Sequence, residues 1–288
     1  MKKNAHTNTQ APHRARKRFG QNFLIDHGVI REIVRAIHPK PGDQLVEIGP
    51  GKGAITQLLA DSGAQLSVIE LDRELVPWLR VRFEKYPGFR LYQADALAFD
   101  FTQLMVDGQP LRIVGNLPYN ISTPLIFHLL SYAERVSDMH FMLQKEVVKR
   151  MAAQPGESAY GRLGIMVQYH CAVEELFEVP PESFDPAPKV DSAIVRLTPH
   201  VQRPFVARDY RLFERLVNLS FQQRRKTLRN SLKGALSAEV IDRLPVDGNA
   251  RAETLSLETF VQLSNLLHAS DFTGPQADQL SSHFDDSH

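Results

Sequence analysis

The sequence predicts an α/β fold with a doubly wound, mostly parallel sheet, an antiparallel addition at one sheet edge and a smaller C-terminal helical domain. In the first two-thirds of the chain, short β-branched runs alternate with amphipathic helical patterns, which is typical of a parallel sheet. From residue 208 onward the apolar spacing is helical. With 288 residues, 43% of them hydrophobic, the chain can bury one large core and a second, smaller one.

The individual elements follow from the apolar spacing in chain order. Expected strands cover residues 44–48, 66–70, 90–93, 111–115 and 139–143. Expected helices between and after these strands cover residues 54–62, 73–85, 123–130 and 145–153. Residues 162–172 and 190–197 are expected to form two more strands, and because they interrupt the alternation they predict the antiparallel addition. The expected helices of the last region cover residues 210–221, 225–232, 237–243 and 256–267.

Composition divides the chain into four expected parts. These are a disordered basic arm (residues 1–16), the sheet domain (17–203), the helical domain (204–269) and a disordered acidic tail (270–288). The formal net charge is only +1, but basic side chains gather near the start and again in the helical region. The two clusters are Arg14, Arg16, Lys17 and Arg18, and then Arg224, Arg225, Lys226, Arg229 and Lys233. Such clusters indicate a polyanionic partner.

Cysteine usage and hydropathy bear on the compartment. The single cysteine, Cys171, excludes an internal disulfide and fits a reducing environment. No apolar run approaches the length of a membrane span, and the polar N-terminus lacks the apolar core of a signal peptide. His170, beside Cys171, makes no metal-ligand spacing with another His or Cys. We therefore expect a cytoplasmic monomer that holds no metal.

A glycine-rich segment, Glu-Ile-Gly-Pro-Gly-Lys-Gly at residues 47–53, stands where the first expected strand gives way to a helix. Glycines there let a ligand approach the backbone closely. Gly49, Gly51 and Ala54 satisfy the dinucleotide fingerprint, and Glu70 ends the next strand near the position of a ribose-binding acid. This segment alone does not exclude an enzyme that binds a nicotinamide dinucleotide. A Rossmann-like S-adenosylmethionine-dependent methyltransferase uses the same geometry.

Asp95, which follows the third expected strand, favours the methyl donor. Its carboxylate can accept a hydrogen bond from an adenine amino group, whereas a dinucleotide enzyme has no general need for an acid there. The ordinary alternatives are that Asp95 caps a turn or helix and that Glu70 only ends a strand at the surface. Glu47 can meet the charged amino-acid portion of the donor or orient the glycine loop. Together these acids converge on the carboxyl edge of the sheet, where open α/β folds bind ligands.

The tetrapeptide Asn116-Leu117-Pro118-Tyr119 follows the fourth expected strand. An exocyclic adenine amine attacks only when its lone pair is drawn out of the ring, and Asn116 with a nearby carbonyl can accept its two protons. Pro118 fixes the local backbone, and Tyr119 offers a face on which a base can stack. An ordinary strand-to-helix turn is the alternative. With Asp95, the tetrapeptide predicts an adenine methyltransferase.

At this point the chain resembles the ribosomal RNA adenine N6-dimethyltransferases, and in particular those that modify small-subunit RNA. The resemblance runs from residue 18 to residue 267. Besides the motifs above, it rests on Arg-Phe-Gly-Gln-Asn-Phe-Leu at 18–24, Phe-Asp-Pro-Ala-Pro-Lys-Val-Asp-Ser at 184–192 and Phe-Gln-Gln-Arg-Arg-Lys-Thr-Leu-Arg-Asn-Ser-Leu at 221–232.

The resemblance implies methylation of two adjacent adenosines in the 3′-terminal hairpin loop of 16S rRNA, in the small ribosomal subunit or its precursor. It implies S-adenosylmethionine as methyl donor, with S-adenosylhomocysteine as product, no metal, and a role in subunit maturation. Domain 17–203 would bind the donor, and domain 204–269 would bind RNA.

The resemblance also assigns site residues. The donor would contact Gln21, Asn22, Leu24, Gly49, Gly51, Glu70, Leu71, Asp95, Ala96 and Asn116. The catalytic residues would be Asn116, Pro118, Tyr119 and Phe184, with Phe184 facing Tyr119 across the target base. A loop anchor buried against the sheet is the alternative for Phe184. On a helix, Arg225, Arg229 and Lys233 would line one RNA-binding face together with Arg224 and Lys226 nearby, or would form a solvated face.

Three other functions remain to be weighed. DNA adenine methyltransferases share the donor loop but typically have Pro where Leu117 stands, and carry a DNA-recognition domain that this sequence does not show. Large-subunit RNA dimethylases share residues 21–24 and 116–119 but lack the motif at 221–232. A non-catalytic ribosome-assembly factor would keep the fold without turnover, and the intact set of donor-pocket residues argues against it.

Overall fold

The computed structural model describes residues 21–269 except 224 and 234. Two compact units divide this range: residues 21–148 with 174–199 form the first, and 149–173 with 200–269 form the second. The second unit thus includes residues 149–173, which the sequence-based division assigned to the sheet domain. The predicted disordered arm (1–16) and acidic tail (270–288) lie outside the described residues, as does the first basic cluster.

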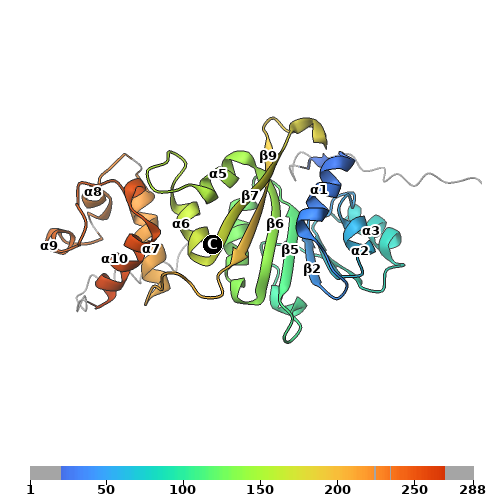
Figure 1. Ribbon diagram of the computed structural model, residues 1–288, viewed down its shortest axis with the longest axis horizontal. Coiled ribbons are helices and arrows are strands. Elements are labelled where there is room, and N and C mark those ends of the chain that lie inside the picture. Colours follow the sequence, from blue (N-terminus) through green and yellow to red (C-terminus); the bar gives the residue numbers. More distant parts are fainter. Residues whose placement is uncertain (1–20, 224, 234, 270–288) are drawn as a thin grey trace, which may run out of the picture. The chain divides into compact units, whose positions relative to one another are not determined.

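The main sheet has seven strands in the order β4-β3-β2-β5-β6-β9-β7, and Figure 1 shows its central strands side by side. The strands are β2 (Gln44–Ile48), β3 (Gln65–Glu70), β4 (Phe89–Gln93), β5 (Leu111–Asn116), β6 (Val136–Gln144), β7 (Cys171–Val179) and β9 (Ser192–Pro199). β4, β3, β2, β5 and β6 are mutually parallel, whereas β9 is antiparallel to β6. The predicted parallel sheet with an antiparallel edge addition is confirmed.

The helices of the first unit include one that the sequence analysis missed. The predicted helices are α2 (Thr56–Asp61), α3 (Leu75–Phe83), α4 (Ser122–Leu130) and α5 (Lys145–Ala152), which runs into the second unit. The missed helix is α1 (His27–Ile37), which buries Ile30, Ile33 and Ile37 in the same core cluster as residues of β2 and β5. Its signals were present, because those apolar residues recur at helical spacing and Asp26 caps the helix by accepting from the backbone N–H groups of residues 28 and 29.

A two-stranded sheet fastens the segment that precedes α1. β1 (Phe23–Leu24) pairs antiparallel with β8 (Phe184–Asp185), so that Leu24 lies opposite Phe184. Two-residue strands have no periodicity that a sequence could reveal. They hold residues 21–24 over the glycine-rich loop, where the site is built.

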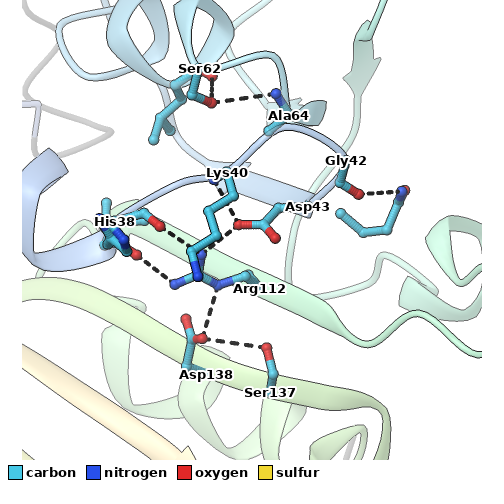
Figure 2. A network of polar contacts seen from close by, with 12 residues as sticks. His38, Lys40, Gly42, Asp43, Ser62, Ala64, Arg112, Ser137 and Asp138 are labelled. Carbon is cyan, nitrogen blue, oxygen red and sulfur yellow. Dashed lines mark hydrogen bonds and ion pairs between the residues drawn. The ribbon is translucent and has the colours of Figure 1, made fainter.

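Arg112 on β5 joins the end of α1 to the sheet (Figure 2). Its Nε lies 2.9 Å from Asp138 Oδ2 on β6, and its Nη1 lies 2.7 Å from Asp43 Oδ2 just before β2. Its Nη2 donates to the Ile37 carbonyl at 2.5 Å. Burial alone would raise the pKa of Asp138, but contacts with His140 and Arg112 hold that pKa below its usual range. The network fixes the position of Asp138 on β6, beside β5.

The second unit is built from helices, and α7 packs beside α10 (Figure 1). Its helices are α6 (Arg162–His170), α7 (Tyr210–Phe221), α8 (Leu228–Leu232), α9 (Ala238–Asp242) and α10 (Leu257–Ala269). The predicted strand at 162–172 was wrong, because residues 162–170 form α6. Nearly every side chain from Leu163 to Tyr169 is buried, and a continuous apolar run cannot distinguish a buried helix from a buried strand.

No helix within the described part of the chain is long and apolar enough to cross a membrane.

Candidate active site

A cavity of about 340 Å³ opens at the carboxyl edge of the sheet, within the first unit. Its volume falls within the range of small-molecule sites, at the lower end. The predicted residues that line it are Gln21, Asn22, Leu24, Gly49, Gly51, Glu70, Leu71, Asp95, Ala96, Asn116, Pro118 and Tyr119. They come from segments far apart in sequence, and the parallel strands bring their ends to one place.

The glycine-rich loop forms one wall of the cavity. Gly51 has a positive φ of 56°, and a Cβ there would lie 3.0 Å from the ring of Phe23. Gly49 also has a positive φ, of 67°. Side chains other than glycine rarely adopt this backbone, so the loop keeps its shape and leaves its backbone bare toward the cavity. The Lys52 ammonium sits 4.6 Å from the centre of the Phe23 ring.

Residues 21–24 are tied to the site by side-chain hydrogen bonds. The Asn116 amide donates to the Asn22 carbonyl at 3.2 Å, and the Gln21 amide donates to Asp72 Oδ2 at 3.1 Å. Asp72 is only 2% exposed and also accepts from the backbone N–H of Glu74 at 3.1 Å. Sequence reasoning missed Asp72, although its place two residues after Glu70 was a signal. It links the N-terminal segment to the end of β3.

The two acids at the ends of β2 and β3 are buried. Glu47 is 1% exposed, and its Oε2 has no hydrogen-bond partner. Burial raises the pKa of Glu47 to about 8 and that of Glu70 to about 6. Glu70 Oε1 accepts from the backbone N–H of Asp72 at 2.7 Å. Two partly uncharged carboxyls in one cavity suit a cationic ligand, which restores their charged form.

Asp95 lies at the exposed rim of the cavity after β4. Its Oδ1 accepts from the Leu97 backbone N–H at 2.9 Å, so it does form the local turn that was the ordinary alternative. A carboxylate can accept more than one hydrogen bond, and the turn therefore leaves acceptor capacity for a ligand amine.

Asn116 and the residues after it form the opposite wall. Because the Asn116 amide nitrogen donates to Asn22, its Oδ1 is the atom left to accept a proton from a ligand. The Pro118 carbonyl accepts from the Ile121 backbone N–H at 3.1 Å and retains a second lone pair. The Tyr119 hydroxyl lies 2.8 Å from the Ser192 hydroxyl, which fixes the half-buried ring. Burial raises the pKa of Tyr119 above its ordinary value.

Phe184 does not line this cavity. Its side chain is 4% exposed and packs in the same core cluster as Phe23 and Leu24. This placement favours the loop anchor over a position facing Tyr119. A contact between Phe184 and a target base remains a prediction from the resemblance.

The late basic residues are arranged differently from the predicted helix face. α8 begins only at Leu228, because the Thr227 hydroxyl caps it by accepting from the Asn230 backbone N–H, so Arg225 and Lys226 precede the helix. Arg229 forms an ion pair with Asp242, which raises the Arg229 pKa. The predicted shared face of Arg225, Arg229 and Lys233 is therefore wrong. Arg225, Lys226 and Lys233 are exposed, and Arg224 lies outside the described residues.

Among residues 21–269 without 224 and 234, no group of three His, Cys, Asp or Glu side chains comes together in a way that could hold a metal ion.

Curated relatives and solved structures resemble the chain over most of its length. Ribosomal RNA small subunit methyltransferase A of Pseudomonas putida is 61% identical over 260 residues, covering 90% of this chain and 97% of the relative. The protein of the same name from Saccharophagus degradans is 60% identical over 265 residues, covering 92% and 99%.

The solved structure of a dimethyladenosine transferase from Plasmodium falciparum superposes with a TM-score of 0.71 at 27% identity, covering 85% of this chain and 97% of that one. The 23S rRNA methyltransferase ErmE gives a TM-score of 0.67 at 26% identity, covering 86% and 100%. The family model described as Ribosomal RNA adenine dimethylase matches residues 12–269. With this match over most of its length, the chain belongs to the ribosomal RNA adenine dimethylase family.

Proposed function

We propose that the protein transfers methyl groups from S-adenosylmethionine to N6 of two adjacent adenosines in the 3′-terminal hairpin loop of 16S rRNA, in the small ribosomal subunit or its precursor. The observation that carries the proposal is the cavity that gathers Glu70, Asp95, Asn116 and Tyr119 at one sheet edge. The target follows from relatives about 60% identical that are named for the small subunit. The protein would act in the cytoplasm as a monomer.

The methyl donor fits the chemistry of the wall formed by the glycine-rich loop and the acids beside it. The bare backbone at Gly49 and Gly51 gives close approach, and the buried Oε2 of Glu47 lacks a hydrogen-bond partner that a cationic ligand would supply. Glu70 would accept from the ribose hydroxyls, and Asp95 from the adenine amino group. When bound, the donor supplies an electrophilic sulfonium methyl group. The protein's own contribution is to orient it and exclude water.

The target base fits the opposite wall, which Asn116 and the residues after it form. Tyr119 would stack on the flipped adenine, and such stacking is worth about 1–3 kcal/mol per base, which offsets the few kcal/mol of unstacking. Asn116 Oδ1 and the Pro118 carbonyl would accept the two N6 protons, which draws the amine lone pair out of the ring. No strong base is required, because the amine becomes acidic as the new bond forms and releases its proton to water. Orientation of this kind supplies about 7–11 kcal/mol in well-aligned cases.

The proposal is tested by methyl transfer from radiolabelled S-adenosylmethionine to small subunits that lack the modification, with large subunits, naked 16S rRNA and DNA in parallel. We expect label in N6-dimethyladenosine of the small-subunit RNA alone. Donor binding without label on any substrate would instead support a non-catalytic assembly factor. Label on large-subunit RNA or DNA would overturn the target.

Exposed basic residues of the second unit are proposed to contact RNA phosphates. Replacing both Arg225 and Lys226 by Glu is expected to weaken RNA binding and to reduce the slope of log affinity against log salt by about 1.5, since each phosphate contact contributes roughly 0.7–0.9. Filter-binding assays between about 50 and 200 mM salt measure this change in slope, because RNA affinity varies strongly with salt over that range. Arg229 is left intact because it pairs with Asp242.

The matched control for this pair makes the same charge change elsewhere. Arg80 and Lys85, both exposed, are replaced by Glu at and after the last turn of α3. An equal loss of slope in both variants would show a non-specific charge effect and would remove Arg225 and Lys226 from the proposed RNA surface.

A further inference from the structure

Tyr119, the proposed stacking residue, is held at both ends by buried serine hydroxyls. The Tyr119 hydroxyl lies 2.8 Å from the hydroxyl of Ser192, the first residue of β9. The hydroxyl of Ser122, the first residue of α4, donates to the Tyr119 carbonyl at 3.2 Å. Ser192 is 0% exposed and Ser122 is 2% exposed, whereas Tyr119 is half-buried and lines the cavity. The two contacts therefore restrain both the backbone and the far end of one side chain.

The strand that carries Ser192 is paired within the sheet. Ser192 lies in register with Gln144 at the end of β6. Ile194, two residues further along β9, lines the cavity, and the alternation of side chains along a strand places Ser192 on the same face. Ser192 is not itself among the lining residues, so its effect on a bound base must act through Tyr119.

The contact between the two hydroxyls limits how the Tyr119 ring can move. Tyr119 lies in the loop between β5 and α4, where a half-buried side chain can turn to another χ1 rotamer. The hydroxyl is the side-chain atom farthest from the backbone, so a hydrogen bond there favours one χ1 angle. Stacking uses the face of the ring and not its hydroxyl. A Phe at this position would offer the same face without the fixed direction.

A fixed ring should matter more for the second methyl transfer to an adenosine than for the first. In the first transfer, Asn116 Oδ1 and the Pro118 carbonyl are proposed to accept the two N6 protons. The monomethylated amine retains one proton, so one of these two hydrogen bonds is lost. The orientation of the base then depends more strongly on its stack against Tyr119.

We propose that Ser192 is a positioning residue for methyl transfer. It holds the Tyr119 ring in the direction that stacking requires, and it supports the second transfer to each adenosine more than the first. This inference rests on the proposed function and adds to it a residue that contacts neither the donor nor the base.

The test compares the wild type, Ser192→Ala, Tyr119→Phe and the double variant in single-turnover methylation of small subunits that lack the modification, at saturating donor. Mass analysis of the adenosines over time gives a rate for each of the two transfers. Each single variant is expected to slow the second transfer about 2- to 10-fold, the effect of one neutral hydrogen bond, and the first transfer by less. N6-monomethyladenosine should therefore accumulate. The double variant should be no slower than the single variants, because all three lose the same contact.

Ser220→Ala is the matched control. It removes another buried serine hydroxyl, which donates to the Leu216 carbonyl within α7 at 2.7 Å. We expect it to leave the ratio of the two transfer rates unchanged. In Ser192→Ala, calorimetric titration should give an affinity for S-adenosylhomocysteine within about twofold of the wild type, because the lost contact does not reach the donor.

The outcomes separate this inference from the proposed function. Equal slowing of both transfers would overturn the inference, because a smaller fraction of folded protein lowers both rates alike. Wild-type rates in Ser192→Ala would also overturn it, and Tyr119→Phe provides the same test if Ser192→Ala does not fold. A double variant that multiplies the two single effects would show that Ser192 acts independently of Tyr119, again against the inference. Each of these results leaves the proposed function standing, whereas a wild type that transfers no methyl group contradicts both.

Discussion

Replacing Asn116 by Ala is expected to lower the rate of methyl transfer at least about 100-fold, the scale on which a lost orienting contact acts. The substitution removes the Oδ1 acceptor proposed for the target amine. It also removes the hydrogen bond to the Asn22 carbonyl, so donor affinity should fall as well. That second loss should be about tenfold at most, because it is one neutral hydrogen bond. Single-turnover rates at saturating donor and RNA measure the first effect, and titration with S-adenosylhomocysteine measures the second.

Asn120→Ala is the matched control for this prediction. Asn120 is an exposed residue of the same loop and lies just beyond the tetrapeptide. We expect it to keep the wild-type rate within a few-fold. If Asn116→Ala retains more than about a tenth of the rate at saturation, the amine is not activated by this side chain. If both variants fall equally, the loop conformation rather than the Asn116 acceptor is responsible.

The sheet could be predicted because its residues satisfy a local pattern. β2, β3, β4, β5 and β6 appear near their predicted positions, since each contains a short run rich in apolar residues that is bounded by turns or helices. α6 was mistaken for a strand because both of its faces are buried, which removes the polar side that marks a helix. Only tertiary packing decides such a segment.

The site was predictable to the extent that it follows from the strand ends. Glu70, Asp95 and Asn116 terminate or follow parallel strands, so their convergence is a property of the fold. His140 lies within a strand and carries no motif, and its place beside the cavity depends on a register that the sequence does not state. Arg229 was misassigned for a similar reason, because its partner Asp242 is brought close only by the turn between α8 and α9.

Replacing Glu47 by Gln is expected to stabilise the protein at pH 8 and to have little effect near pH 4.5. The folded protein raises the pKa of Glu47 to about 8 from an ordinary value of 4.5. Between these values the folded state keeps a proton that the unfolded chain has released, so the free energy of unfolding falls as the pH rises, by up to about 1.4 kcal/mol per pH unit. Gln imitates the protonated carboxyl and removes that loss. The gain at pH 8 should approach about 4 kcal/mol.

Urea unfolding of the wild type and of Glu47→Gln at pH 5 and pH 8 measures this difference in stability. The control is Glu84→Gln, which changes an exposed carboxyl just after α3 and should alter the free energy of unfolding by less than about 0.5 kcal/mol. A buried carboxyl that weakens the empty protein is expected where a site is shaped for its ligand rather than for stability. The two properties should therefore separate in this variant, which becomes more stable while binding the methyl donor more weakly. If Glu47→Gln matches the wild type in stability at both pH values, contacts within the free protein already stabilise the charged carboxylate. Glu47 would then not need a cationic ligand beside it.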